Sequence, residues 1–82
     1  MDPDELYENV RRRPFEPFRI HLVDGTMYEI RHPDAVWVGR SVAVLGTPAA
    51  GQPRTKLRDD MIALLHICRL EPITPPAPPY NT

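Results

Sequence analysis

Apolar residues recur at every second position in two neighbouring segments, residues 18–23 and 26–31. The alternating apolar residues are Phe18, Ile20, Leu22, Tyr28 and Ile30. Successive side chains of a β-strand point to opposite faces, so the pattern predicts two strands that are each covered on one face. We expect them to form a β-hairpin.

The connection between these strands fixes which residues face each other. A two-residue turn would place Ile20 opposite Glu29 and mix the buried and exposed faces. A three-residue loop over 23–25, with Gly25 in the left-handed conformation of a bulge, instead pairs Ile20 with Tyr28. The same register pairs Leu22 with Thr26 and Phe18 with Ile30.

Residues 3–13 are expected to form a helix ahead of the hairpin. Asp2 is suited to cap its start and Pro14 to end it, and Leu6 and Val10 share one face. Three arginines fall in the last turn, where positive charge offsets the negative end of the helix dipole. They are Arg11, Arg12 and Arg13.

Two further short runs, residues 35–38 and 41–45, are rich in valine and predict a second hairpin with a tight turn at Gly39-Arg40. A turn over residues 32–34 separates the two hairpins, because proline cannot donate to a strand ladder. Residues 46–60 contain glycine and proline without periodicity and predict a surface loop. Positive charge in this loop lies at Arg54, Lys56 and Arg58.

The run from Met61 to Glu71 is continuously apolar at its start and predicts the last strand, with a short helix over 59–65 as the alternative. Residues 73–82 are rich in proline and predict a disordered, polyproline II-like tail. This tail is either a binding segment for a protein partner with an aromatic-lined groove or a solubilising terminus.

These elements predict a mostly β fold in one domain over residues 1–72. An N-terminal helix precedes five short strands in meander order, and so few residues can hide the strand edges only by bending strongly into a small barrel.

Composition narrows the classes of function. The 82 residues carry a net charge of −1, so the whole molecule lacks a positive field for polyanions. No apolar run approaches the roughly 18 residues of a membrane span, and the acidic N-terminus is unlike a secretory signal, so we expect a cytoplasmic protein without membrane contact. The single cysteine, Cys68, is interpreted as a core residue.

Catalytic and metal-binding patterns are absent from the sequence. The three histidines, His21, His32 and His66, have no ligand spacing, and we expect no metal and no cofactor. We interpret His21 as an outward strand residue beside Glu29. Asp59-Asp60 is expected to stay solvated, and no nucleophile stands beside a base, so we expect no enzyme.

Several motifs resemble the Sm-like RNA chaperones of the bacterial host-factor (Hfq) family. The segment 17–25 resembles their first strand and turn, and the arginine-tipped helix precedes it as in that family. Residues 34–37 are similar to the entry into their third strand, and residues 65–67 resemble the start of their last strand. The segments 14–22 and 29–33 also resemble small uncharacterised bacterial proteins.

The resemblance implies an Sm-like or SH3-like barrel that assembles into rings and binds RNA. It implies that the helix-end arginines contact RNA at the rim and that His66 lies in a uridine pocket. Trp37 is either a base-stacking surface or a core residue. Leu65 stands where the family has a lysine.

Two hypotheses follow. The first is a non-enzymatic small barrel that forms a homo-oligomer and binds RNA through Trp37, His66 and the arginines 11–13. The alternative is a protein-interaction module of the same fold without nucleic-acid affinity, which the near-neutral charge and the missing lysine favour.

Overall fold

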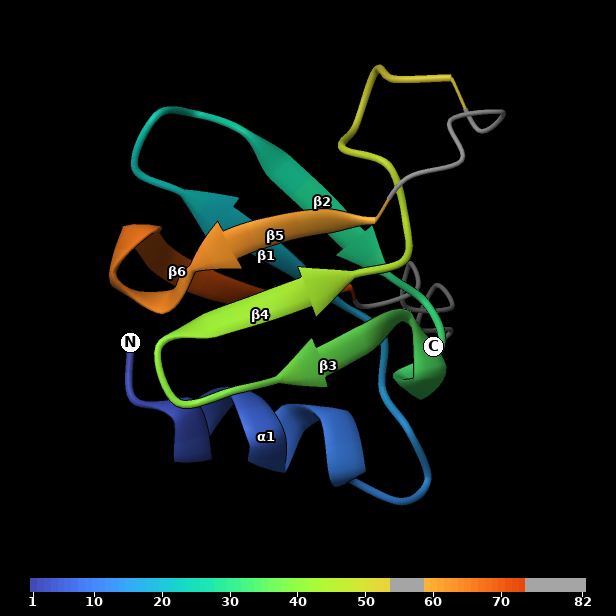
Figure 1. The fold of residues 1–82 in the computed structure, drawn as a ribbon. Coiled ribbons are helices and arrows are strands. Elements are labelled where there is room, and N and C mark those ends of the chain that lie inside the picture. The colour runs from blue at the N-terminus through green and yellow to red at the C-terminus, as the bar shows by residue number, and fades with distance from the viewer. Residues whose placement is uncertain (54–58, 74–82) are drawn as a thin grey trace, which may run out of the picture.

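The computed structural model describes residues 1–53 and 59–73, and its fold is mostly β with one N-terminal helix (Figure 1). The elements are α1 (Pro3–Arg11), β1 (Phe18–Leu22), β2 (Met27–Ile30), the 3₁₀ turn η1 (Pro33–Ala35), β3 (Val36–Val38), β4 (Val42–Leu45), β5 (Asp60–Ala63), the 3₁₀ turn η2 (Leu64–His66) and β6 (Ile67–Pro72). The expected positive charge at residues 54–58 and the tail from residue 74 lie outside the described residues. No helix in the described ranges is both long enough and apolar enough to span a bilayer.

The first hairpin has the predicted register. Ile20 faces Tyr28 and Phe18 faces Ile30. The Leu22 N–H donates to the carbonyl of Thr26 at 2.8 Å, and Gly25 has a φ of +91°. That angle lies in the left-handed region, which glycine adopts without the steric cost of a Cβ.

The second hairpin is also present, with its turn one residue later than predicted. The Gly39 N–H donates to the carbonyl of Val42 at 2.8 Å, so Arg40 and Ser41 form the turn. The expected turn over residues 32–34 is η1, for which His32 is the N-cap residue.

The prediction of one last strand and five strands in all is wrong. The described part of the chain contains six strands, because η2 divides the Met61–Glu71 run into β5 and β6. The buried residues Ile62, Leu64 and Ile67 explain the break, since a spacing of three between the last two does not fit a continuous strand. The alternative helix over 59–65 is also wrong, because β5 occupies most of that stretch.

The six strands form two antiparallel sheets of three, in the orders β2-β1-β6 and β3-β4-β5, in place of the five-stranded, strongly bent barrel. The turn η2 carries the chain from one sheet to the other and is bonded to both. Its Leu64 N–H donates to the carbonyl of Ser41 at 2.9 Å, and its His66 carbonyl accepts from the Val23 N–H at 2.8 Å.

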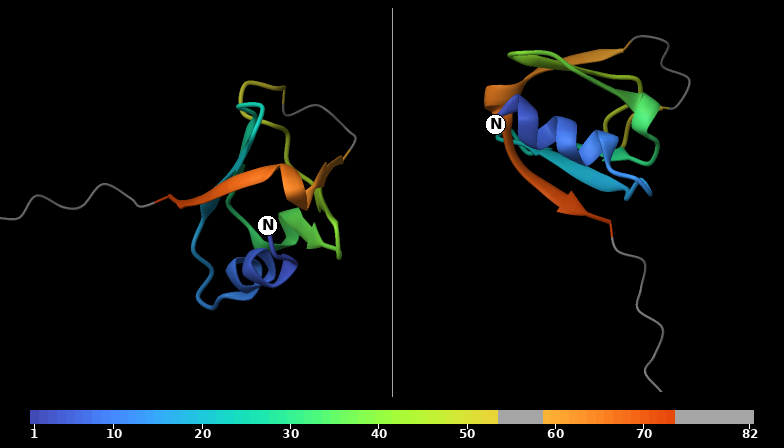
Figure 2. Two further views of the ribbon diagram at one scale, coloured as in Figure 1. Left: turned by 90° about the vertical axis from the view of Figure 1, so that its left-hand side faces the viewer. Right: turned by 90° about the horizontal axis from the view of Figure 1, so that it is seen from below.

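One apolar layer fills the space between the sheets, and α1 covers the side on which the layer would otherwise be open (Figure 2). All of its members are at most 9% exposed. They are Leu6, Val10, Phe18, Ile20, Tyr28, Ile30, Val36, Ala43, Leu45, Ile62, Leu64 and Ile67.

The helix begins as predicted and ends two residues early. The Asp2 carboxylate accepts from the Asp4 N–H at 2.9 Å. Arg12 is the C-cap residue with extended backbone, and Arg13 lies outside the helix, because a residue before proline is disfavoured in helical conformation. The Arg13 guanidinium donates to the carbonyls of Val10 at 3.1 Å and Arg12 at 2.9 Å.

The polar contact that joins the sheets lies between Tyr28 and Asp60. The Tyr28 hydroxyl on β2 donates to Asp60 Oδ2 on β5 at 2.9 Å, and the Tyr28 side chain is 5% exposed. Burial, followed by the hydrogen bond to Asp60, raises the pKa of Tyr28 from its ordinary value of 10.0 to about 12. The neutral hydroxyl is therefore favoured in the folded state.

We predict that alkaline pH weakens the fold through Tyr28. Because the folded-state pKa is raised, its contribution is complete below pH 10 and is lost as the pH rises from 10 to about 12, by about 2 kcal/mol. Urea unfolding across this pH range should show that the free energy of unfolding of the native protein falls, and that the free energy of unfolding of Tyr28→Phe does not fall in this way. Tyr7→Phe, which removes a half-exposed hydroxyl, should retain the loss; equal pH profiles for all three proteins would contradict the assignment.

We also predict that Arg13 stabilises the helix end. Arg13→Ala removes two hydrogen bonds to terminal carbonyls and should lower the free energy of unfolding by about 0.5–1 kcal/mol. Arg11→Ala should change it by less than about 0.5 kcal/mol, because Arg11 makes an exposed ion pair. Chemical denaturation measures both, and equal effects would rule out a capping role.

Candidate interaction surface

Each of the three predicted RNA-contacting arginines has a partner within the chain. Arg11 Nε lies 3.5 Å from Glu8, and its guanidinium carbon lies 5.6 Å from the centre of the Tyr7 ring. Arg12 lies 3.1 Å from Glu16. Together with the hydrogen bonds of Arg13 to helix carbonyls, these contacts explain the three consecutive arginines as residues that stabilise the end of α1.

The predicted RNA-binding residues do not converge on one site. The Met1 ammonium donates to the Leu64 carbonyl at 3.1 Å, so η2, and His66 with it, lies beside the start of α1. The arginines lie at the other end of α1, about 14 Å away along a nine-residue helix. Trp37 is on β3, on the outer face of its sheet.

Trp37 is 75% exposed, so its interpretation as a core residue is wrong. The alternation of β3 explains its position: Val36 is buried, Val38 packs against the core, and Trp37 between them points outward. Its exposure leaves Trp37 available for stacking or for binding another molecule.

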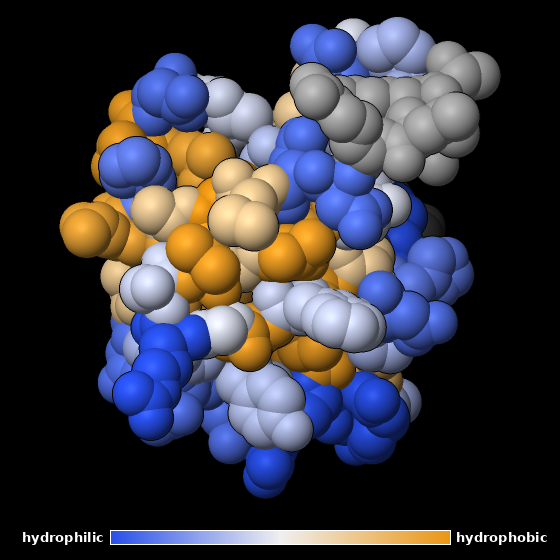
Figure 3. All heavy atoms as spheres, in the orientation of Figure 1, coloured by the Kyte–Doolittle hydropathy of each residue, from blue (hydrophilic) through white to orange (hydrophobic). Residues whose placement is uncertain are grey.

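The outer face of the β3-β4-β5 sheet, which we call the apolar face, carries a row of three apolar residues across the strands. Trp37 pairs with Val44, and Val44 pairs with Met61, which is 69% exposed. Val42 and Ala63 form a second apolar pair beside this row. Figure 3 shows apolar residues gathered on this side of the molecule, over β4 and β5.

A contiguous apolar face of this kind is a candidate binding surface. Exposed apolar residues normally occur singly, whereas contiguous apolar patches mark binding sites. At roughly 150–250 Å² for a whole Trp side chain, Trp37 alone exposes more than about 100 Å². The strand ladder holds these residues in a fixed arrangement, as a binding surface requires.

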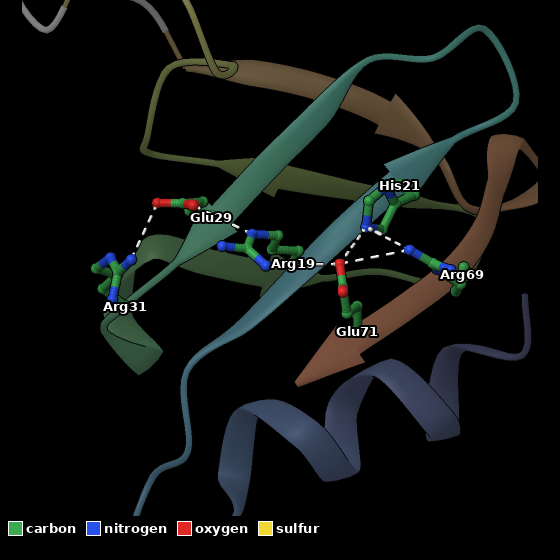
Figure 4. Close-up of polar contacts among 6 residues, drawn as sticks. All are labelled: Arg19, His21, Glu29, Arg31, Arg69 and Glu71. Carbon is green, nitrogen blue, oxygen red and sulfur yellow. Dashed lines mark hydrogen bonds and ion pairs between the residues drawn. The ribbon is translucent and has the colours of Figure 1, made fainter. Parts of the chain in front are cut away.

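The outer face of the β2-β1-β6 sheet is charged instead (Figure 4). Its side chains form a connected series of ion pairs and hydrogen bonds across the three strands. The members are Arg19, His21, Glu29, Arg31, Arg69 and Glu71. His21 points outward as predicted, but it contacts Glu71 at 2.9 Å, whereas Arg19 is the partner of Glu29 at 3.1 Å.

The carboxylates of this network are held in their charged form. The hydrogen bond from Arg19 is the main cause that lowers the pKa of Glu29. The hydrogen bond from His21 is the main cause that lowers the pKa of Glu71. This face therefore satisfies its charges internally, and the apolar face has no comparable internal partners.

Two other predicted features differ in the structure. Cys68 is exposed, with Sγ 3.4 Å from the His21 carbonyl, so the core interpretation is wrong. Asp60 bonds to Tyr28 and is more than a solvated residue. The described residues contain no group of three or more potential metal ligands.

A hollow of about 600 Å³ lies between the end of β2 and residues 46–52. Its charged residues Glu29 and Arg31 lie 3.1 Å apart and pair with each other. The same hollow is also lined by His32 and Thr47.

Comparison of the chain with protein-family models, with curated proteins and with solved structures found no match. The resemblance to Sm-like RNA chaperones therefore stays a prediction from short motifs. The case for function depends on the surfaces of this chain. Among residues 1–53 and 59–73, the apolar face is the surface on which Trp37 and Met61 stay exposed.

Proposed function

We propose that this chain is a protein-interaction module whose binding surface is the apolar face. The observation that carries the proposal is the row Trp37, Val44 and Met61, which is contiguous across three strands and exposed at both ends. Apolar and aromatic residues in the centre of an interface supply most of its binding energy.

The free energy gained by covering the apolar face is large enough to support binding of a partner. Covering the exposed part of Trp37 removes more than about 100 Å² from water, which contributes at least about 2.5 kcal/mol at 25 cal/mol per Å². Met61 adds a flexible, polarisable side chain that adapts to a partner. Because a three-stranded sheet carries both, little backbone entropy is lost on binding, and the entropic cost falls on the Met61 side chain.

The charges favour a protein over RNA as the partner. The net charge of the chain is −1, and the arginines at the end of α1 are engaged by Glu8, Glu16 and helix carbonyls. Binding to phosphates depends on free basic groups. We include in the proposal a relation of this fold to SH3-like small barrels, which the motif resemblance implies.

The test compares the apolar face with an equally exposed residue elsewhere. Met61→Ser and Trp37→Ser alter the face, and Val23→Ser, at a residue 66% exposed in the first hairpin loop, is the control. A partner recovered by cross-linking in the source cells, then purified, should bind the native protein and the control equally. Its affinity for each face variant should fall about thirtyfold, as for a hot spot worth about 2 kcal/mol.

Two outcomes would contradict the proposal. One is a partner whose affinity is unchanged by both face variants. The other is tight RNA binding that weakens with added salt, survives Trp37→Ser and is lost when Arg11, Arg12 and Arg13 are all replaced by alanine. That second result would establish the RNA-binding hypothesis in its place.

A further inference from the structure

The strand β6 has one open edge. Its sheet has the order β2-β1-β6, and β6 has no neighbouring strand on its other side within residues 1–53 and 59–73. An open edge presents backbone donors and acceptors to another chain. The charged residues of β6 and the groove between β6 and α1 determine what can pair with this edge.

The hydrogen-bond alternation identifies which backbone groups are available. The Ile73 N–H donates to the Pro17 carbonyl at 3.0 Å, and Leu70 faces Ile20 three positions along the ladder. Antiparallel pairs alternate between hydrogen-bonded and non-hydrogen-bonded, so residues 69, 71 and 73 bond to β1. The N–H and C=O of Leu70 therefore point away from β1, toward the open edge.

A groove of about 400 Å³ lies beside this edge, between β6 and α1. Leu70 and Pro72 line it on the strand side, and Asn9 and Arg12 line it on the helix side. Neighbouring strands lie about 4.8 Å apart, so a strand that pairs with β6 would lie along this groove.

We propose that a second copy of this chain occupies the edge, with the two β6 strands antiparallel about a two-fold axis at Leu70. Each Leu70 then donates to and accepts from Leu70 of the second copy. In this register Arg69 lies opposite Glu71 of the second copy, and the symmetry repeats the pair. This surface is separate from the apolar face and goes beyond the proposed function.

Charge selects this register over its neighbours. Moving the axis to residue 69 places Arg69 opposite Arg69, and moving it to residue 71 places Glu71 opposite Glu71. Like charges directly opposite destabilise a strand pair. The Arg69 side chain is exposed and lies 3.4 Å from its own Glu71, on the side of the network nearest the edge, so in the dimer it is shared between its own Glu71 and Glu71 of the second copy (Figure 4).

The symmetry of the pairing limits the assembly to two chains. In this register Pro72 lies opposite Cys68 of the second copy and, because it lacks an N–H, it cannot donate a hydrogen bond there, so the pairing depends on the two hydrogen bonds at Leu70. The two-fold pairing uses each β6 edge once and leaves none for a third copy. The expected product is a closed dimer.

Amide hydrogen exchange, measured by NMR as a function of protein concentration up to about 1 mM, tests the proposal. The Leu70 amide should exchange fast in dilute protein and at least tenfold more slowly at high concentration, as sedimentation shows a dimer. The Glu71 amide, which bonds to β1, should be protected throughout. Unchanged Leu70 exchange, or a monomer at every concentration, would overturn the proposal.

A charge-reversal variant separates this edge from the apolar face. Arg69→Glu places like charges opposite each other twice and should shift the dimerisation midpoint by at least tenfold in concentration. Arg31→Glu changes an arginine at the other edge of the same network and should leave it unchanged. A dimer that survives Arg69→Glu and is lost in Trp37→Ser would overturn the β6 contact while leaving the proposed function in place.

Discussion

The burial of one apolar layer between two small sheets is the constraint on which the structure depends. Neither three-stranded sheet can hide its apolar side alone, so each uses the other, and α1 covers the remaining gap with Leu6 and Val10. The chain crosses between the sheets at η2, where Leu64 is 2% exposed and fills the layer at the crossing point. The hydrogen bond between Tyr28 and Asp60 adds a directional link on the far side of the same layer.

Because each sheet buries one side in the core, the outer sides of the two sheets determine what the molecule can bind. The first sheet presents a network of alternating charges in which Glu29 and Glu71 each accept from two basic partners or more. The second presents Trp37 and Met61 without such partners. A charged face that is satisfied internally stays in water at little cost, whereas an exposed apolar face gains free energy when another molecule covers it. This contrast supports an interaction module.

The sequence predicts the parts of the fold in which one rule dominates. Alternation and Gly25 are enough for the register of the first hairpin, because a slip by one residue would expose its whole core face. The alternation rule fails for the 61–71 run because both faces carry apolar residues: Met61 points outward and Ile62 points inward. The sequence pattern therefore does not show where η2 interrupts the strand. For Trp37 the sequence leaves two interpretations open, a base-stacking surface and a core residue, because the residue type alone does not show which face of the strand is buried. Its exposure of 75% excludes the core interpretation. The motif resemblance selects the candidate RNA-binding residues, but it cannot show whether they lie together in space. The structure shows that His66 lies near the start of α1 and the arginines lie at its end.

Solvent paramagnetic relaxation measured by NMR on dilute protein tests the central claim most directly. With a soluble paramagnetic probe, the Trp37 indole and the Met61 methyl should relax as fast as surface groups, and the methyls of Ile20 and Leu45 should be shielded. Shielding of Trp37 and Met61 to the same degree as Ile20 would show that the face is buried in the free protein. That result would contradict the two-layer arrangement and the function proposed from it.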